Sequence, residues 1–339
     1  MKILVTGGLG FIGSHTVVEL QNKGYEVLIV DNLSNASIEV LQGIATITGV
    51  VPHFEKIDLK DKIKVETFFN KHKDIAGVIH FAASKAVGES VEKPLMYYEN
   101  NVNALIYLLK SVANLKTSNF IFSSSCTVYG QADTMPITEE APVKPAKSPY
   151  GNTKQIGEEI IIDISKAHPD FRAVSLRYFN PIGAHPSGKI GELPLGIPQN
   201  LVPFITQTAA GVRKQLAVFG NDYPTPDGTC IRDYIHVVDL AKVHVIALER
   251  ILKRENTKKV EIFNLGTGKG SSVMEVINAF ENVTGKKLNY VFAPRRKGDV
   301  VQAYADTSKA NTVLGWKAEK TLEDAVRDAW NWEKKVRNL

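Results

Sequence analysis

The sequence has few cysteines, and this shortage excludes several classes of protein. Its 339 residues include only two, Cys126 and Cys230, which cannot build a disulfide framework and lack the paired spacing of a zinc site. We therefore expect no metal site. A protein with so little cysteine is typical of a reducing compartment, so we expect a cytoplasmic location.

Long apolar runs and basic runs are also missing. No stretch of about 18 apolar residues occurs, and the first residues pass from a short apolar run straight into glycines, so neither a membrane span nor an export signal is predicted. The 41 lysines and arginines exceed the 36 acidic residues by only 5 and are spread along the chain. Nucleic acid is therefore not an expected partner.

What the sequence does contain is an alternation of short β-branched runs with longer helical stretches. This pattern predicts an α/β protein with a doubly wound parallel sheet and helices on both faces. After residue 180, prolines and glycines break the pattern into shorter elements. We expect a cofactor-binding domain at residues 1–180, to which later segments return, and a smaller substrate-binding domain at residues 181–339. The expected strands are residues 3–6, 27–30, 53–57, 78–82, 120–123, 174–179 and 261–265.

Three glycines follow the first expected strand and precede a helix expected at residues 14–23. They would allow a tight turn, close approach of the backbone to a pyrophosphate, and close packing of helix on strand. Asp31 follows the second strand, where a carboxylate would bind an adenosine ribose and repel a 2′-phosphate. The combination predicts a Rossmann-type site for NAD. Its expected residues are Gly7, Gly10, Phe11, Ile12, Gly13, Asp31 and Asn32.

A second acidic position follows the third expected strand. Asp58 and Leu59 could flank the adenine ring, but Asp58 could equally cap the next helix. The sequence leaves both interpretations open.

A tyrosine and a lysine are predicted to share one face of a later helix. Ser148 and Pro149 are typical of a helix start, which places Tyr150 in the first turn and Lys154 one turn later. Beside a dinucleotide, such a phenol and ammonium can transfer a proton. Lowering a phenol pKa from about 10 to near 7 takes about 4 kcal/mol, and a helix end supplies about 0.3 to 2 kcal/mol. We expect Lys154 and a positive nicotinamide ring to supply the rest.

These motifs resemble the extended short-chain dehydrogenase/reductase family, and nearly the whole chain resembles its sugar-nucleotide epimerases. The resemblance implies an isomerase that interconverts UDP-glucose and UDP-galactose. Inversion at carbon 4 would pass through a 4-keto intermediate with transient reduction of NAD. A UDP-hexose substrate and a homodimer are implied as well. The matching stretches are residues 7–13, 80–90, 122–130, 177–180, 183–188, 219–224 and 232–236.

The resemblance also assigns roles to single residues. Ser125 is implied to bridge the substrate and Tyr150. Two arginines suit the charge of a diphosphate, and a phenylalanine can cover a uracil ring. Besides Tyr150 and Lys154, the implied cofactor contacts are Phe81, Ala82, Ala83, Lys85, Asn100, Ser123 and Tyr178. The implied contacts to the UDP-sugar are Phe179, Asn180, Asn200, Leu201, Phe219, Arg232, Arg296 and Asp299.

Three positions have consequences beyond these assignments. In the family, the residue four places after the aspartate at position 299 lines the pocket near the sugar's 2-position, and a tyrosine there excludes an N-acetyl group. Here it is Ala303, so we expect UDP-N-acetylglucosamine and its galacto epimer to be accepted too. Ser84 replaces a usually apolar residue. Cys126 replaces an alanine and is expected to be a small buried packing residue.

Two other functions compete with the epimerase. A 4,6-dehydratase needs an acid pair after the serine of the fifth strand, and Ser124, Ser125 and Cys126 offer no carboxylate. A noncatalytic NAD-binding regulator should have lost a catalytic group, but Ser125, Tyr150 and Lys154 are all present. The helices at residues 94–113 and 150–167 carry apolar stripes, which could pair with a second copy or be buried within the subunit.

Overall fold

The computed structural model of the protein describes residues 1–115, 118–296 and 299–339. Contacts within the chain divide it into two compact units. The first comprises Met1–Gln131, Glu140–Tyr178 and Ala241–Phe263, and the second Ala132–Glu139, Phe179–Leu240 and Asn264–Leu339. Among the described residues, no helix is long and apolar enough to cross a membrane.

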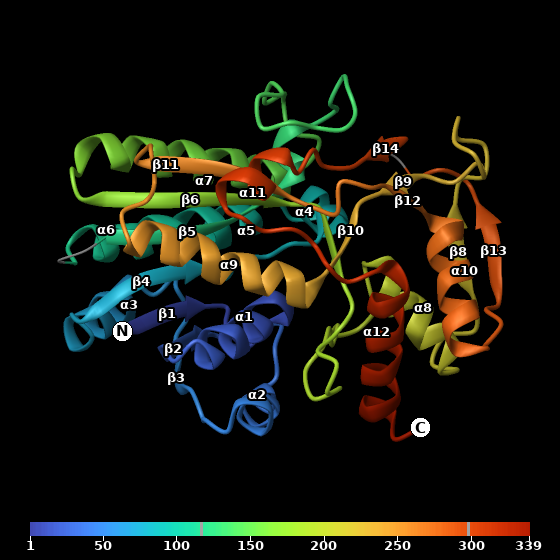
Figure 1. The fold of residues 1–339 in the computed structure, drawn as a ribbon, viewed down its shortest axis with the longest axis horizontal. Helices are drawn as coiled ribbons and strands as arrows, with labels where there is room; N and C mark the ends of the chain where they lie inside the picture. The colour runs from blue at the N-terminus through green and yellow to red at the C-terminus, as the bar shows by residue number, and fades with distance from the viewer. Residues whose placement is uncertain (116–117, 297–298) are drawn as a thin grey trace. The chain divides into compact units, whose positions relative to one another are not determined.

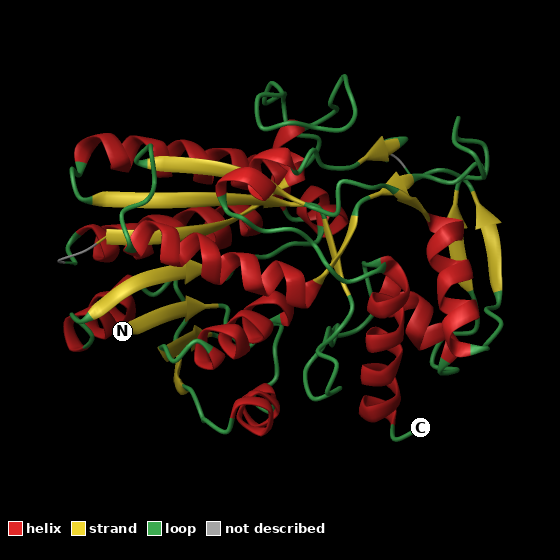
Figure 2. Cartoon of the chain, in the orientation of Figure 1, coloured by secondary structure: helices red, strands yellow, loops and turns green. Residues whose placement is uncertain are grey.

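The first unit is built on a seven-stranded sheet with the order β11-β6-β5-β4-β1-β2-β3 (Figures 1 and 2). The strands from β6 to β3 pair in parallel register. All seven expected strands are present, and the order of β1 to β6 is that of dinucleotide-binding sheets, which confirms the predicted fold class. The strands are β1 Lys2–Thr6, β2 Glu26–Asp31, β3 His53–Lys56, β4 Ile75–His80, β5 Ser118–Ser125, β6 Phe171–Tyr178 and β11 Val260–Leu265.

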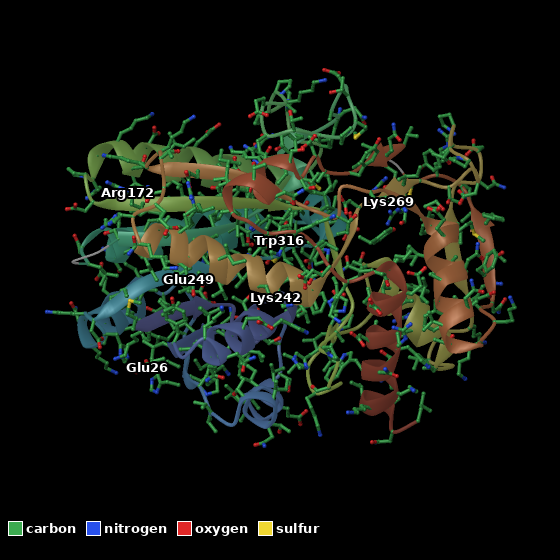
Figure 3. The ribbon with its side chains drawn as sticks, in the orientation of Figure 1. Glu26, Arg172, Lys242, Glu249, Lys269 and Trp316 are labelled. Atoms are coloured by element: carbon green, nitrogen blue, oxygen red, sulfur yellow. The ribbon has the colours of Figure 1, made fainter. Side chains whose placement is uncertain are left out.

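Helices cover both faces of this sheet, because its strands are apolar on both faces. On one face Phe68, Leu108 and Ile161 pack against the strands in a continuous core. On the other, Leu248 lies so close to Gly77 of β4 that a Cβ there would come within 2.7 Å of it. The helix that carries Leu248 also carries Lys242 and Glu249, labelled in Figure 3. The helices are α1 Phe11–Asn22, α2 Val40–Thr48, α3 Lys62–Lys71, α4 Val87–Glu92, α5 Pro94–Tyr98, α6 Ala104–Ala113, α7 Pro149–Ala167 and α9 Val237–Leu252, which begins in the second unit.

Two expected helices have different bounds in the structure. The helix expected at residues 14–23 begins at Phe11, because Gly10 is the last extended residue (φ −73°, ψ 175°) before the first turn. The helix expected at residues 94–113 is interrupted by a π-helix, Glu99–Asn103. Such turns often mark functional sites, because the wider turn redirects side chains.

The second unit consists of short strands and helices around its own core. Its sheets have the orders β10-β7, β12-β9-β14 and β13-β8. Ile205, Ile277, Phe280 and Trp330 join α8, α10 and α12 in one core. The elements are β7 Asn180–Ile182, α8 Leu201–Ala209, β8 Leu216–Phe219, β9 Ile231–Arg232, β10 Tyr234–His236, β12 Ser271–Ser272, α10 Val273–Thr284, β13 Tyr290–Ala293, β14 Gln302–Ala303, α11 Ser308–Val313 and α12 Leu322–Arg337.

Candidate active site

Gly7 in the turn between β1 and α1 and Gly13 in the first turns of α1 have no room for a side chain. Gly7 has a φ of 69°, and a Cβ on it would come within 2.7 Å of the backbone nitrogen of Ala82. A Cβ on Gly13 would lie 2.2 Å from the carbonyl oxygen of Gly7. Gly10 provides no side-chain cap for α1, so the amides of the first turn are available to an anion. The turn therefore fits the pyrophosphate of a dinucleotide.

Asp31 stands at the end of β2 with its carboxylate held by the backbone. One oxygen accepts a hydrogen bond from the amide of Leu9 at 3.2 Å, and the other accepts one from the amide of Leu33 at 2.9 Å. Burial raises the pKa of Asp31, and the backbone hydrogen bonds oppose this rise. The carboxylate is therefore held in one orientation beside the glycine turn, as a ribose contact requires.

Asp58 does not cap α3. That helix is capped by Asp61, which accepts a hydrogen bond from the amide of Lys64 at 3.1 Å, so the capping interpretation of Asp58 is wrong. Asp58 accepts a 3.4 Å hydrogen bond from the side chain of Asn32 instead. Leu59 is buried in the core of the first unit.

The π-helix places two asparagines against the loop that follows β4. Asn100 donates to the hydroxyl of Ser84 at 3.1 Å. Asn101 accepts from the amide of Ser84 at 2.8 Å and donates to the hydroxyl of Thr153, the neighbour of Lys154, at 3.1 Å. Ser84, which departs from the family pattern, thus holds this loop in place. Asn101 was missed from the sequence, because a polar residue inside a helical stretch has no periodic signal.

The other expected cofactor contacts of the first unit lie in the loop after β4 and near the ends of β5 and β6. The amide of Phe81 donates to the carbonyl of Thr6 at 3.0 Å, so the ends of β4 and β1 are adjacent. Tyr178 donates to the hydroxyl of Ser123 at 2.5 Å. Ala83 and Lys85 lie on either side of Ser84 in the loop after β4.

Tyr150 and Lys154, the predicted catalytic pair, lie on the helix where the sequence places them. Ser148 accepts a hydrogen bond from the amide of Gly151 at 3.2 Å and Pro149 is the first residue of α7, which confirms the predicted helix start. Lys154 is 4% exposed, and its Nζ donates to the carbonyl of Ser123 at 2.6 Å. The same Nζ lies 5.8 Å from the centroid of the Tyr150 ring.

Burial dominates the pKa values of this pair. It raises the pKa of Tyr150 to about 12, although a hydrogen bond with Ser125 opposes the rise. It lowers the pKa of Lys154 to about 8, although the negative charge of Glu158 opposes the fall. The expectation that Lys154 and the positive nicotinamide ring together lower the pKa of Tyr150 concerns the cofactor-bound site and stays a prediction.

A buried ion pair adjoins the lysine. Arg177 donates two hydrogen bonds to the carboxylate of Glu158, at 2.9 and 2.5 Å, and Ser124 donates a third at 2.5 Å. The guanidinium carbon of Arg177 also lies 4.8 Å from the centroid of the Tyr129 ring. Glu158 was missed from the sequence, although its place one turn after Lys154 on α7 was a usable signal.

In the second unit, four of the residues expected at the UDP group lie together. Asp299 accepts hydrogen bonds from Arg232 at 3.3 Å and from Arg296 at 2.9 Å. The guanidinium carbon of Arg296 lies 5.2 Å from the centroid of the Phe219 ring. One carboxylate thus holds two cations next to an aromatic ring, which suits a diphosphate attached to a flat base.

The remaining residues of the expected UDP-sugar site occupy other elements of this unit. Ala303 on β14 is the register partner of Arg232 on β9. Asn180 begins β7, and Phe179 before it is buried. Asn200 precedes α8, of which Leu201 is the first residue, and its side chain donates to Glu192 at 2.7 Å.

One expectation about packing is wrong. Cys126 is half-buried and not buried, because it begins the short 3₁₀ turn Cys126–Tyr129 that follows β5. Neither cysteine forms a disulfide.

Comparison with known proteins identifies the family. A model of the GDP-mannose 4,6 dehydratase family matches residues 4–329. The UDP-glucose 4-epimerase of Bacillus subtilis (strain 168) is 51% identical over 333 residues, which are 98% of this chain and 97% of that protein. The crystal structure of UDP-glucose 4-epimerase from Bifidobacterium longum in complex with NAD+ and UDP has a TM-score of 0.95 and 48% identity, covering 100% of this chain and 99% of that one.

A second solved structure agrees. The UDP-glucose-4-epimerase from Stenotrophomonas maltophila with bound NAD and formylated UDP-arabinopyranose has a TM-score of 0.95 and 45% identity, covering 100% of this chain and 99% of that one. The fold and the tyrosine–lysine pair thus define a dinucleotide-binding enzyme of the short-chain dehydrogenase/reductase class. Within that class, the chain belongs to the UDP-glucose 4-epimerase family.

Proposed function

We propose that this protein is an isomerase that interconverts UDP-glucose and UDP-galactose by inverting carbon 4 of the hexose, with NAD as its cofactor. The observation that carries the proposal is the Tyr150–Lys154 pair at the start of α7, hydrogen-bonded to β5 through Ser125 and Ser123. The glycine turn and the fixed carboxylate of Asp31 lie on the same sheet and fit a dinucleotide.

In this proposal the two units bind different ligands. The first unit binds NAD through the turn after β1, Asp31 and the residues after β4 and β5. The second unit binds the UDP group, with Arg232 and Arg296 on the diphosphate and Phe219 against the uracil. Because Asp299 bonds to both arginines, it fixes where their positive charge lies.

The chemistry divides between the cofactor and three side chains. When bound, NAD supplies a hydride acceptor for carbon 4, a hydride donor for the other face of the 4-keto sugar, and the positive charge of its nicotinamide ring. Tyr150 takes the proton of the 4-hydroxyl and later returns it, and Ser125 hydrogen-bonds to both the phenol and the sugar. Lys154 stabilises the phenolate. Burial raises the pKa of Tyr150 to about 12, so in this proposal the positive charges of both Lys154 and the bound nicotinamide ring stabilise the phenolate.

The direct test is to incubate the purified protein with UDP-galactose and no added cofactor, and to separate the UDP-hexoses by chromatography. UDP-glucose should form until the two sugars reach equilibrium. A 4-keto-6-deoxy product would instead indicate a dehydratase, the activity in the name of the matching family model.

The structure around Ser125 argues against that dehydratase. Elimination needs a carboxylic acid and a base beside the sugar. The carboxylate that bonds to this segment, Glu158, is buried and paired with Arg177, so it is not available as a base. This agrees with the lack of acidic residues in the segment from Ser124 to Cys126.

The proposal extends to N-acetylated sugars. Ala303 lies directly beside Arg232, the residue assigned to the diphosphate, and contributes only a methyl group to that position. A small side chain there leaves space for an acetamide at the sugar's 2-position. UDP-N-acetylglucosamine and UDP-N-acetylgalactosamine are therefore included as substrates.

A homodimer and a cytoplasmic location complete the proposal. The apolar side chains of Val91 on α4 and Leu95 on α5 are 62% and 81% exposed, and exposed apolar groups of this kind suit an interface between copies. Light scattering on a size-exclusion column should give twice the 37.3 kDa mass of the chain. A mass of 37.3 kDa at micromolar concentration would contradict the dimer. The two cysteines without a disulfide suit a reducing compartment.

A further inference from the structure

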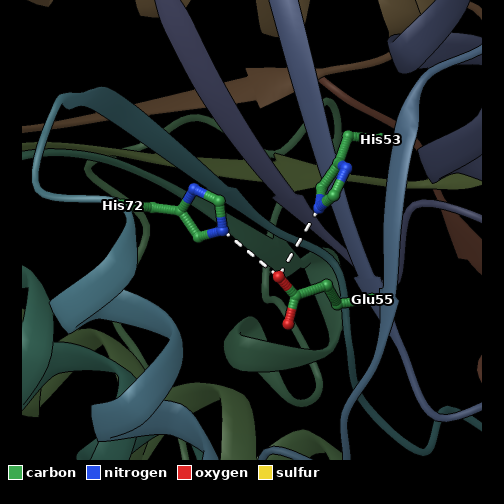
Figure 4. Close-up of side chains that lie close together, drawn as sticks. All are labelled: His53, Glu55 and His72. Carbon is green, nitrogen blue, oxygen red and sulfur yellow. Dashed lines mark hydrogen bonds and ion pairs between the residues drawn. The ribbon is translucent and has the colours of Figure 1, made fainter.

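Two histidines and a glutamate converge at the outer edge of the seven-stranded sheet (Figure 4). His53 and Glu55 lie on β3, the edge strand, and His72 follows the last residue of α3. His53 and Glu55 are the register partners of Leu28 and Val30 on β2, so their side chains point to the face of the sheet opposite that of Asp31. This cluster is therefore outside the site described above.

Local structure brings the three side chains together. His53 and Glu55 are two residues apart on one strand, so they point to the same face. The ring of His72 lies 4.6 Å from the ring of the buried Phe68, which limits its orientation. Nε2 of His72 is 3.2 Å from Oε1 of Glu55, and Nε2 of His53 is 3.5 Å from the same oxygen.

We propose that His53, Glu55 and His72 form a binding site for a divalent transition metal ion of the zinc class. Two imidazoles and one carboxylate are a ligand set that zinc uses in proteins. Ligand atoms about 2.0 to 2.1 Å from a tetrahedral zinc ion are about 3.4 Å from one another. The two glutamate–histidine separations of 3.2 and 3.5 Å already match this value.

The third separation needs only a small adjustment. The three ligand atoms all lie within 4.8 Å of one another. The side chain of His53 is 53% exposed, so its ring can rotate toward His72 without displacing other groups. Water can complete the coordination from the exposed side.

The carboxylate of the cluster favours binding of a cation, and the nearby charge of Lys71 opposes it. A glutamate side chain is ordinarily ionised at neutral pH, so the carboxylate of Glu55 can act as a ligand. The charge of Lys71 also acts on Glu55. Lys71 repels a cation, and this repulsion weakens the site without occupying any of its ligand atoms.

A bound ion would join the edge strand to the end of α3. Cysteine spacing gives no sign of such a site, because its ligands are histidine and glutamate side chains, and Glu55 and His72 are 17 residues apart. The site is independent of the proposed epimerase activity.

The test is isothermal titration calorimetry, in which zinc chloride is added to the chelator-treated full chain. Wild type should bind one ion per chain, and its melting temperature should rise with zinc because the ion binds only the folded chain. Each of the variants His53→Gln, Glu55→Gln and His72→Gln should weaken binding by at least about tenfold, since even the loss of an outer-shell partner has an effect of that size.

His168→Gln is the matched control, since His168 is an exposed histidine at the end of α7. It should bind zinc as wild type does. The proposal is wrong if wild type shows no saturable binding, or if any one of the three ligand variants keeps wild-type affinity. Circular dichroism of each variant establishes that its fold is intact. An unchanged epimerase assay in all four variants would show that the site and the active site are separate.

Discussion

Tyr150 is the residue whose loss has the clearest predicted effect. Tyr150→Phe keeps the ring and its packing but removes the proton that passes to and from the sugar. Turnover of UDP-galactose should fall by about 10²- to 10⁴-fold, the usual contribution of a general acid or base. The measurement is the steady-state rate together with calorimetric binding of UDP, which should be unchanged.

Tyr107→Phe on α6 removes a hydroxyl from the same unit and should leave turnover as in wild type. If Tyr150→Phe retains wild-type turnover with an intact fold, another group is the acid and base.

Glu158 is a positioning residue whose effect passes through Lys154. Its negative charge favours the ammonium form, so Glu158→Gln should lower the pKa of Lys154 further below its ordinary range. Because the ammonium stabilises the Tyr150 phenolate, the alkaline limb of kcat/KM should move to lower pH. The variant also leaves Arg177 buried without its partner, which should reduce the free energy of unfolding by about 3 to 5 kcal/mol.

Glu159→Gln is the control, because it neutralises the exposed glutamate next to Glu158. It should change neither the pH profile nor the denaturant midpoint. A Glu158→Gln enzyme that is less stable but has the wild-type pH profile would restrict Glu158 to a structural role.

The role of Tyr150 could be predicted from the sequence, whereas that of Glu158 could not. Tyr150 and Lys154 follow a serine and a proline that identify a helix start, so their shared face could be predicted. The partnership of Glu158 and Arg177 depends on how α7 packs on β6, which no local pattern contains. The burial of Tyr150, which raises its pKa in the protein without cofactor, also depends on the complete fold.

At the scale of elements, the pairing of β14 with β9 sets the size of the proposed sugar pocket. Ala303→Tyr places a phenol ring beside Arg232, where the wild type has a methyl group. Turnover of UDP-N-acetylglucosamine should fall by at least about tenfold, since filling a pocket of this kind costs at least 1 to 3 kcal/mol. Turnover of UDP-glucose should change much less.

Both rates are measured on wild type and variant under the same conditions. If wild type does not convert the N-acetylated sugar, or if the tyrosine leaves its rate unchanged, Ala303 does not control access.

The strands were easier to predict than the interruptions in the helices. Six of the seven strands could be recognised as apolar runs because both faces of the sheet are largely buried there, whereas the edge strand β3, with the sequence HFEK, is partly exposed. The π-helix at Glu99–Asn103 could not be recognised, since Asn101 within it is hydrogen-bonded to Ser84 and Thr153, residues distant in sequence. Strands as short as β9 and β14 have two residues each and no periodicity to detect.

For the whole molecule, the proposed reaction returns NAD to its starting state, so the cofactor never has to leave. The purified protein should therefore release NAD(H) when denatured by acid or heat, in an amount close to one per chain. Removal of the cofactor should lower the melting temperature, because NAD binds only the folded state. Chromatography of the supernatant identifies the dinucleotide. Recovery of NADP, or activity that requires stoichiometric external NADH, would contradict retention.

One strand of the first unit's sheet is synthesised much later than the others. Strands β1 to β6 are complete by residue 178, but β11, which pairs with β6, is not made until residues 260–265. While the ribosome adds the intervening segment, β6 has one unpaired edge, although in the finished protein it is almost wholly buried. Nascent chains of this length therefore carry a strand edge able to pair with other chains, and we expect truncation before residue 260 to produce aggregates where the complete chain folds.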